Sequence, residues 1–181
     1  MQISDAPCLQ SLVLGECELR LSHWRLAYAD ELYQLICRNR EYLKPWLGWI
    51  SEIANPFDSE CYIRQLQHAF IEHRAFPCAL HYGEQLVGFC GLDRINRFLG
   101  RGRMGYWLGE NFQGNGLMTA AGGMLLSLAF DELGLAEVEC LVDESNLRSR
   151  AVCQRLGLAL QAHKVDDELL CYRITKDEYV D

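Results

Sequence analysis

The stretch Gly105–Ala121, GYWLGENFQGNGLMTAA, contains three kinds of local sequence in succession. An aromatic segment typical of a strand ends at Leu108, a polar turn with two glycines follows, and an apolar helix begins near Leu117. A strand that leads through such a turn into a helix presents the unpaired N–H groups of the helix's first turn beside the strand's carboxyl end. This arrangement favours an anionic ligand, and a pyrophosphate is the ligand that we expect.

Gly114 and Gly116 do not by themselves identify the ligand. Without a Cβ, they let the backbone bend tightly and approach a bound group closely. A dinucleotide-binding turn has the pattern Gly-x-Gly-x-x-Gly after an early strand, but here Thr119 stands at the third position and the turn lies past mid-chain. The Gly-Lys-Ser/Thr of a Walker loop is absent from the sequence. A nicotinamide-dinucleotide protein is therefore disfavoured, and a plain structural turn stays open.

Residue periodicity predicts further elements on both sides of this stretch. Before it, the pattern predicts a strand at Leu19–His23 and then a helix capped by Asp30. A second helix is expected to be capped by Asp58 or Ser59, with Phe57 as a hydrophobic staple, and to end near Arg74. A hairpin follows, in which the strands Cys78–Tyr82 and Leu86–Leu92 are joined by a turn at Gly83–Gln85. Around and after it, we expect strand Arg103–Leu108, helix Leu117–Leu133 with Gly134 as its stop, strand Val138–Val142, a helix from Asn146 to Gly157, and strands Leu158–Ala162 and Leu169–Ile174. This order predicts a mixed sheet with helices on its faces, of the α+β or α/β class.

Length and composition bound the architecture. A chain of 181 residues, half of them hydrophobic, is long enough for one core and short for two, so we expect a single domain over residues 1–181. No stretch approaches about 20 consecutive apolar residues, and Met1–Cys8 lacks the basic-then-apolar order of a secretory signal. We therefore expect a cytoplasmic protein that makes no membrane contact.

The nine cysteines lie within apolar segments, as small core residues of a reducing compartment do. Neither Cys-x-x-Cys nor His-x-x-x-His occurs, so we expect no metal site. A reactive thiol stays open as an alternative.

The formal net charge of −8 argues against a nucleic-acid partner and suits a cationic acceptor. The basic cluster Arg94, Arg97, Arg101 and Arg103 is interpreted as a solvated loop rather than a phosphate contact.

Three segments in order match patterns of one enzyme superfamily. Gln113–Met118, QGNGLM, follows Gln/Arg-x-x-Gly-x-Gly/Ala in its first two fixed positions, with Met118 in place of the last. Asn146–Leu158, NLRSRAVCQRLGL, contains Asn-x-x-Ser followed by Leu-Gly, with Leu158 in place of Phe. Asn39–Trp49, NREYLKPWLGW, follows Asn-Arg-x-x-Leu-x-x-Trp-Leu-x-Trp. Together the segments resemble the GNAT acetyltransferases, specifically the RimJ/RimL-like branch that acetylates ribosomal proteins.

This resemblance implies a GNAT-like fold: a mixed, mostly antiparallel central sheet, flanked by helices and splayed between its two middle strands, Met104–Leu108 and Val138–Val142. It implies acetyl-CoA as co-substrate and no metal. The thioester end would meet the backbone of Trp107 and Leu108, where an N–H would stabilise the oxyanion. The residues implied to cradle the pyrophosphate are Gln113, Gly114, Asn115, Gly116, Leu117, Met118 and Thr119. Asn146 would contact the pantetheine, although it is also a good helix N-cap.

The resemblance also suggests catalytic roles. Ser149 matches the serine proposed to protonate the departing thiolate, and Tyr172 is an alternative donor. Glu110, which follows the thioester-binding strand, is the first candidate for the general base, with Asp143 and Glu144 as alternatives. Tyr42, Trp46 and Trp49, together with Trp24, are candidate walls of the acceptor pocket, although core packing would explain aromatic residues equally well.

The acceptor must attack as a neutral amine. A terminal α-amine with a pKa of about 7.7–8.0 is roughly a tenth to a sixth neutral at pH 7, whereas lysine, at about 10.4, is neutral far more rarely. The N-terminus of a protein, such as a ribosomal protein, is therefore the expected acceptor. A small amine such as a polyamine or an antibiotic stays open, as do a non-catalytic CoA-binding module and pairing into a homodimer.

Overall fold

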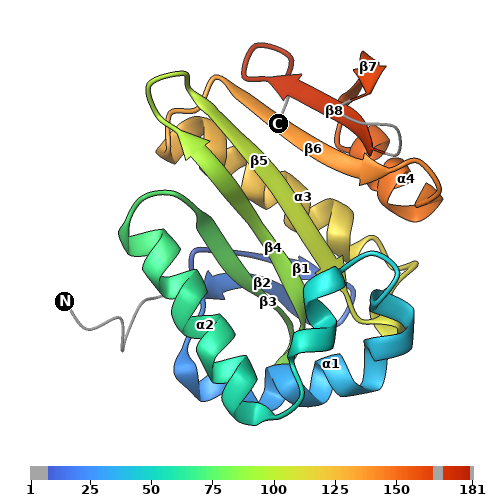
Figure 1. Ribbon diagram of the computed structural model, residues 1–181. Helices are drawn as coiled ribbons and strands as arrows, with labels where there is room; N and C mark the ends of the chain where they lie inside the picture. Colours follow the sequence, from blue (N-terminus) through green and yellow to red (C-terminus); the bar gives the residue numbers. More distant parts are fainter. Residues whose placement is uncertain (1–7, 165–168, 180–181) are drawn as a thin grey trace.

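Eight strands form one sheet in the computed structural model, which describes residues 8–164 and 169–179 (Figure 1). The strands are β1 (Gln10–Leu14), β2 (Cys17–His23), β3 (Phe76–Tyr82), β4 (Gln85–Asn96), β5 (Arg101–Leu108), β6 (Glu137–Asp143), β7 (Ala159–Lys164) and β8 (Leu169–Thr175). Their order across the sheet is β1-β2-β3-β4-β5-β6-β8-β7. Neighbouring strands are antiparallel except β5 and β6, which are parallel, so the prediction of a mixed, mostly antiparallel sheet is confirmed.

Helices cover both faces of this sheet. The α-helices are α1 (Ala29–Leu43), α2 (Pro56–Ile71), α3 (Leu117–Ser127) and α4 (Leu147–Arg155), and the short helical turns are η1 (Leu26–Tyr28), η2 (Gly48–Glu52), η3 (Glu110–Phe112) and η4 (Leu128–Glu132). Two separate apolar clusters result, because side chains alternate along each strand. Leu80 of β3 packs in the cluster that contains α3, whereas its neighbour Ala79 packs in the cluster of α1 and α2.

The sheet opens between β5 and β6. These strands pair only from Arg101 opposite Glu137 to Met104 opposite Cys140. Within the described part of the chain, the rest of β5, Gly105–Leu108, pairs with β4 alone, and Figure 1 shows β5 and β6 diverging there. One edge of β5 therefore offers backbone N–H and C=O groups to a ligand. The predicted splay between the two middle strands is confirmed.

The start of α2 differs from the prediction of a cap at Asp58 or Ser59. Asn55 is the N-cap, because its side chain accepts from the N–H of Asp58 while the Asp58 carboxylate accepts from the N–H of Asn55. Pro56 fills the first helical position, where a missing N–H costs nothing. Phe57 is 68% exposed, so its predicted role as a staple is wrong. The helix ends at Ile71 rather than near Arg74.

In the N-terminal part, one prediction was wrong and one element was not predicted. The helix α1 begins at Ala29 without any side-chain cap, and Asp30 lies in its first turn instead of capping it. Strand β1 was not predicted, because its three central residues, Ser11–Val13, are exposed and show no alternation. It forms by pairing with β2 through a tight turn in which Gly15 has a φ of 65°.

The predicted helix Leu117–Leu133 consists of two parts. Its α-helical part ends at Ser127, and a π-helical turn, η4, continues it to Glu132 before Gly134, which has a φ of 66°. The predicted cap of α4 is confirmed, since Asn146 Oδ1 accepts the Ser149 N–H at 3.1 Å.

The nine cysteines divide between the core and the surface. The thiols of Cys78, Cys90, Cys140, Cys153 and Cys171 are buried as expected. Cys17 and Cys61 are half-buried and Cys8 and Cys37 are exposed, which corrects the expectation that all nine are core residues. Among the described residues, no helix is long and apolar enough to cross a membrane.

Candidate active site

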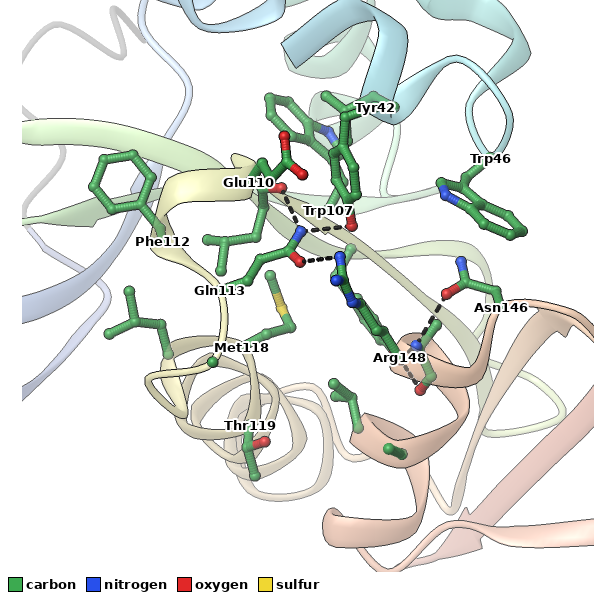
Figure 2. Close-up of a pocket in the computed structure, with 18 of the residues that line it drawn as sticks. Tyr42, Trp46, Trp107, Glu110, Phe112, Gln113, Met118, Thr119, Asn146 and Arg148 are labelled. Carbon is green, nitrogen blue, oxygen red and sulfur yellow. Dashed lines mark hydrogen bonds between the residues drawn. The ribbon is translucent and has the colours of Figure 1, made fainter. Parts of the chain in front are cut away.

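A cavity of about 800 Å³ lies where β5 separates from β6 (Figure 2). Its walls come from the end of α1 and the turn after it, from β5, from the loop before α3, from the first turn of α3, and from one side of α4 along its length. The residues that line it are Tyr42, Leu43, Trp46, Leu47, Tyr106, Trp107, Leu108, Glu110, Phe112, Gln113, Gly114, Gly116, Leu117, Met118, Thr119, Asn146, Arg148, Ser149, Ala151, Val152 and Arg155. Most of the predicted site residues therefore meet in one place.

The glycine turn opens directly onto α3. Gly114 and Gly116 have φ values of 79° and 76°, a left-handed conformation that side-chain-bearing residues rarely adopt, and no atom lies within 4 Å of an added Cβ at either position. No side chain caps α3, and its first helical hydrogen bond runs from the Ala120 N–H to the Gly116 carbonyl. The N–H groups of Leu117–Thr119 thus precede the helical ladder, and N–H groups at such a helix end are suited to an anion.

Two arginines that were not predicted as site residues, Arg148 and Arg155, also line the cavity. Arg155 Nε donates to Thr119 Oγ1 at 3.0 Å, beside the first turn of α3. Arg148 Nη1 donates to Gln113 Oε1 at 3.0 Å, and its guanidinium carbon lies 5.9 Å from the centre of the Tyr42 ring. The sequence contains a signal for this pair, because positions 148 and 155 are seven apart and so share one face of the predicted helix.

Side chains of the segment Asn39–Trp49 hold the loops around the cavity. Asn39 Oδ1 accepts the backbone N–H of Glu110 at 2.8 Å. Arg40 donates to the carbonyl of Ile50, at 2.7 Å, and to that of Ile53. Asn39 and Arg40 thus have a structural explanation, because they fix the two loops that follow β5 and α1.

Ser149 contacts a residue that the sequence analysis did not assign. Its Oγ lies 3.0 Å from the hydroxyl oxygen of Tyr106, which also lies 3.1 Å from the Ser149 carbonyl oxygen and 3.3 Å from Cys153 Sγ. Tyr172, the predicted alternative to Ser149, does not line the cavity. It is 1% exposed, and its hydroxyl accepts from Arg150 Nε at 3.3 Å.

Of the three candidate bases, only Glu110 lines the cavity, and it is exposed. Asp143 and Glu144 lie outside it. The Asp143 carboxylate accepts from the hydroxyl and the backbone N–H of Ser145, at 2.6 and 2.8 Å, and these bonds lower the pKa of Asp143. A carboxylate stabilised in its charged form is a weaker base.

The aromatic candidates separate into two groups. Tyr42 and Trp46 line the cavity (Figure 2), whereas Trp49 stacks on Tyr62 at 4.4 Å between ring centres. Trp24 is 2% exposed and belongs to the core beneath α1 and α2. Core packing therefore accounts for Trp24 and Trp49.

Asn115 does not line the cavity, although the sequence pattern predicts it in the pyrophosphate loop. Its side-chain amide donates to the Gln113 carbonyl at 3.3 Å, within the turn.

The basic cluster on β4, β5 and the turn between them lies outside the cavity. Arg101 and Arg103 pair with Glu137 and Glu139 of β6, each at 3.1 Å. The prediction of a solvated loop is therefore wrong in part: Arg97 lies in the turn, but Arg94 lies on β4, and Arg101 and Arg103 lie on β5 with carboxylate partners on β6. In the part of the chain that the structure describes, no group of three or more His, Cys, Asp or Glu side chains could hold a metal ion.

Known proteins resemble this chain in sequence and in fold. A family model described as the acetyltransferase (GNAT) domain matches residues 18–159. YdaF of Bacillus subtilis, a protein named for ribosomal N-acetyltransferase activity, is 28% identical over 163 residues, which are 83% of this chain and 87% of the relative. The ribosomal-protein-serine acetyltransferase of Escherichia coli is 28% identical over 138 residues, which are 74% and 75% of the two chains.

A solved structure also matches. The microcin C7 self-immunity acetyltransferase MccE, in complex with acetyl-CoA and AMP, superimposes with a TM-score of 0.79 at 25% identity, over 87% of this chain and 92% of that one.

Proposed function

The chain belongs to the GNAT acetyltransferase family, and from that premise we propose that it transfers an acetyl group from acetyl-CoA to the N-terminal α-amine of a protein, with a ribosomal protein as the acceptor. The family makes the chain an acyltransferase of the N-acetyltransferase class. We further propose that residues 1–181 form one such domain, which the single continuous sheet supports.

The observation that carries this proposal is the open edge of β5 beside the cavity. Gly105–Leu108 lack a strand partner on the β6 side, so the amide groups of a pantetheine arm can hydrogen-bond there as an added strand would. We assign the thioester end to the backbone of Trp107 and Leu108, and the pantetheine to Asn146 as well, since all three line the cavity.

The other end of the cavity suits the phosphates of CoA. Gly114 and Gly116 leave the approach to α3 free of side chains, and the N–H groups of its first turn carry partial positive charge. Arg148 and Arg155 add two full positive charges to the same cavity in a chain whose net charge is −8. We therefore assign the pyrophosphate to residues 114–119 and propose that both arginines contact phosphate.

Acetyl-CoA supplies an acetyl group activated as a thioester. In the proposed reaction the acceptor nitrogen bonds to the acetyl carbon while the carbon–sulfur bond breaks and the sulfur leaves with the electron pair. Glu110 takes the proton that the acceptor nitrogen loses, directly or through water. Ser149 gives its hydroxyl proton to the leaving sulfur and is reprotonated from water, while Glu110 returns to water the proton that it took, so the products are the acetylated amine and the CoA thiol. Atoms and charge balance without any oxidant or metal ion.

Chemistry favours an α-amine as the acceptor. An exposed carboxylate such as Glu110 is a modest base, and a terminal amine needs only modest help because a sizeable fraction is already neutral at pH 7. Tyr42 and Trp46, on the α1 side of the cavity, are the proposed contacts for the acceptor chain. The names of the relatives from B. subtilis and E. coli support a ribosomal protein.

A small amine is the second candidate acceptor. MccE, the similar solved structure, is named for self-immunity to microcin C7, so the same fold serves an enzyme that is not named for ribosomal proteins.

Thiol release from acetyl-CoA tests the proposal. The acceptors are peptides with ribosomal-protein N-termini, the same peptides with a blocked α-amine and a free lysine, polyamines, and aminoglycosides. We expect turnover with the free α-amine alone, and mass spectrometry should place the acetyl group there. Turnover with polyamines or aminoglycosides alone would establish the small-amine alternative. Tight CoA binding with no turnover on any acceptor would indicate a binding module.

A further inference from the structure

The side chain of Tyr106 bridges the opening between β5 and α4. Its strand has already left β6, because the last paired residues are Met104 and Cys140, yet its hydroxyl reaches the first turns of α4. There the oxygen lies 3.0 Å from Ser149 Oγ, 3.1 Å from the Ser149 carbonyl oxygen and 3.3 Å from Cys153 Sγ. Tyr106 also lines the cavity beside Ser149.

Counting the hydrogens limits what these contacts can be. Tyr106 has one hydroxyl hydrogen, the Ser149 carbonyl can only accept, and Ser149 Oγ can donate one hydrogen while accepting others. If Tyr106 donates to the carbonyl, the serine hydrogen is free to turn back toward the tyrosine oxygen. If Tyr106 donates to Oγ, the serine hydrogen is directed elsewhere, and the open side of the serine is the cavity. An anion in the cavity favours the second arrangement, because each hydrogen bond in such a chain strengthens the next.

The Ser149 carbonyl is therefore the second acceptor within reach of the Tyr106 hydrogen. The Ser149 N–H takes no part in this choice, because it donates to Asn146 Oδ1 at 3.1 Å and so fixes the first turn of α4. Asn146 therefore orients the serine backbone, while Tyr106 is the polar side chain that contacts Oγ.

We propose that Tyr106 is a positioning residue for acetyl transfer: its hydroxyl donates to Ser149 Oγ and so directs the serine O–H at the sulfur of the acyl donor. This inference rests on the proposed function and adds a residue to it. No proton leaves Tyr106 in the step, so the balance of the reaction is unchanged.

The surroundings of Tyr106 keep it a donor. Burial raises the pKa of Tyr106 well above its ordinary value, and the thiols of Cys140 and Cys153 raise it further. The hydroxyl thus stays protonated throughout the range in which the amine acceptor is reactive. Tyr106 is correspondingly a poor proton source, which agrees with a role through Ser149 rather than in its place.

The kinetic test is Tyr106→Phe, which removes only the hydroxyl. We expect kcat to fall by about tenfold, less than the loss of a full general acid, while the KM for acetyl-CoA stays unchanged. The matched control is Tyr82→Phe, which removes a hydroxyl that donates to the Leu14 carbonyl at 2.9 Å outside the cavity and should leave kcat unchanged. In a Ser149→Ala background, Tyr106→Phe should lower kcat no further. An unchanged kcat in the single variant, or an equal loss in both backgrounds, would overturn the inference.

A second readout needs no acceptor. The pKa of the thiol of bound CoA is measured by a pH titration. At each pH, the thiolate absorbance is the absorbance of the CoA-loaded enzyme minus that of the free enzyme. A serine O–H directed at sulfur stabilises the thiolate, so this pKa should rise by about one unit in Tyr106→Phe and equally in Ser149→Ala. An unchanged pKa in Tyr106→Phe contradicts the inference even if no acceptor is ever found. If the pKa shifts appear but no acceptor is acetylated, the proposed function is refuted and the inference about Tyr106 stands. If the protein fails to bind CoA, the proposed function and the inference are both refuted.

Discussion

Nε2 of Gln113 donates a 2.6 Å hydrogen bond to the hydroxyl oxygen of Tyr42, which joins the loop before α3 to the last turn of α1 (Figure 2). The other end of the same carboxamide, Oε1, accepts from Arg148 of α4 at 3.0 Å. One side chain therefore connects three walls of the cavity. The family pattern implied that Gln113 touches the cofactor, whereas the structure shows its amide bound to protein groups on both sides.

The first prediction concerns this connection. Gln113→Leu and Tyr42→Phe should each lower the free energy of unfolding, and the double variant should cost less than their sum, with a coupling of about 1 kcal/mol. Chemical denaturation measures the three values. Gln113→Leu combined with the distant Tyr82→Phe provides the additive control. Strict additivity of Gln113→Leu with Tyr42→Phe would show that the bond contributes nothing in solution.

The second prediction concerns the phosphate end. Gly116→Asp should weaken CoA binding by tenfold or more, on the order of 1.4 kcal/mol, because a carboxylate would face the phosphates at the start of α3. Gly134→Asp is the matched control, since Gly134 also has a positive φ, of 66°, and open space around it, but lies outside the cavity. Calorimetric titration with CoA compares the two. Equal affinities in two folded variants would remove the phosphate from this turn.

The third prediction concerns Ser149. Ser149→Ala should lower kcat by roughly 100-fold, at the low end of general acid catalysis, and leave the KM for acetyl-CoA unchanged. Stability should change little, because Asn146 supplies the cap of α4. Ser127→Ala, which removes a hydroxyl bound to Asp131 on the surface, is the control. A variant with wild-type turnover would exclude Ser149 as the donor to sulfur.

The fourth prediction separates the candidate bases. Glu110→Gln should lower kcat/KM for the acceptor by roughly 100-fold without changing CoA affinity, because a general base contributes to the chemical step. Glu144→Gln, outside the cavity, should behave as wild type. Steady-state kinetics with a peptide acceptor compares the two. The assignment fails if Glu144→Gln is the impaired variant.

The fifth prediction concerns pH and stability. Burial, reinforced by Arg20 and Arg25, lowers the pKa of His81 to about 4. An unfolded histidine takes up its proton below a pH of about 6.5, so between about 6.5 and 4 the unfolded chain binds more protons than the folded one. Stability should therefore fall as the pH falls through this window, by up to about 3 kcal/mol.

Denaturation curves at several pH values measure this effect. His81→Gln removes the titrating group and should flatten the dependence above a pH of about 5, where carboxylates contribute little. His23, whose pKa burial also lowers, leaves a smaller residual slope. An identical pH dependence in the variant and the wild type would show that His81 titrates normally in the folded protein.

Local signals sufficed for most of the fold. Alternation and helical spacing located β3, β4, β6 and the four α-helices, because each of these elements buries one face or is buried throughout. Strand β1 was not predicted, since its central side chains are exposed and it forms through its pairing with β2. The start of α2 was misplaced because Asn55, Asp58 and Ser59 all suit a cap, and only the reciprocal bonds of Asn55 and Asp58 decide among them.

The sequence by itself determined the family and the proposed phosphate end of the site, because three short patterns each act within one loop or one turn of helix. Gly114, Gly116, Asn146 and Ser149 could be named for that reason. Only the tertiary structure decided which side chains meet across the cavity. It joined Tyr106 to Ser149 and Gln113 to Tyr42, because contacts between residues more than 40 positions apart depend on strand order and helix packing. It also stacked Trp49, which is partly buried, on Tyr62 against the core of α1 and α2. The conformation of a turn depends on residues next to each other in the sequence, whereas the contacts of a side chain in the cavity depend on the fold of the whole chain.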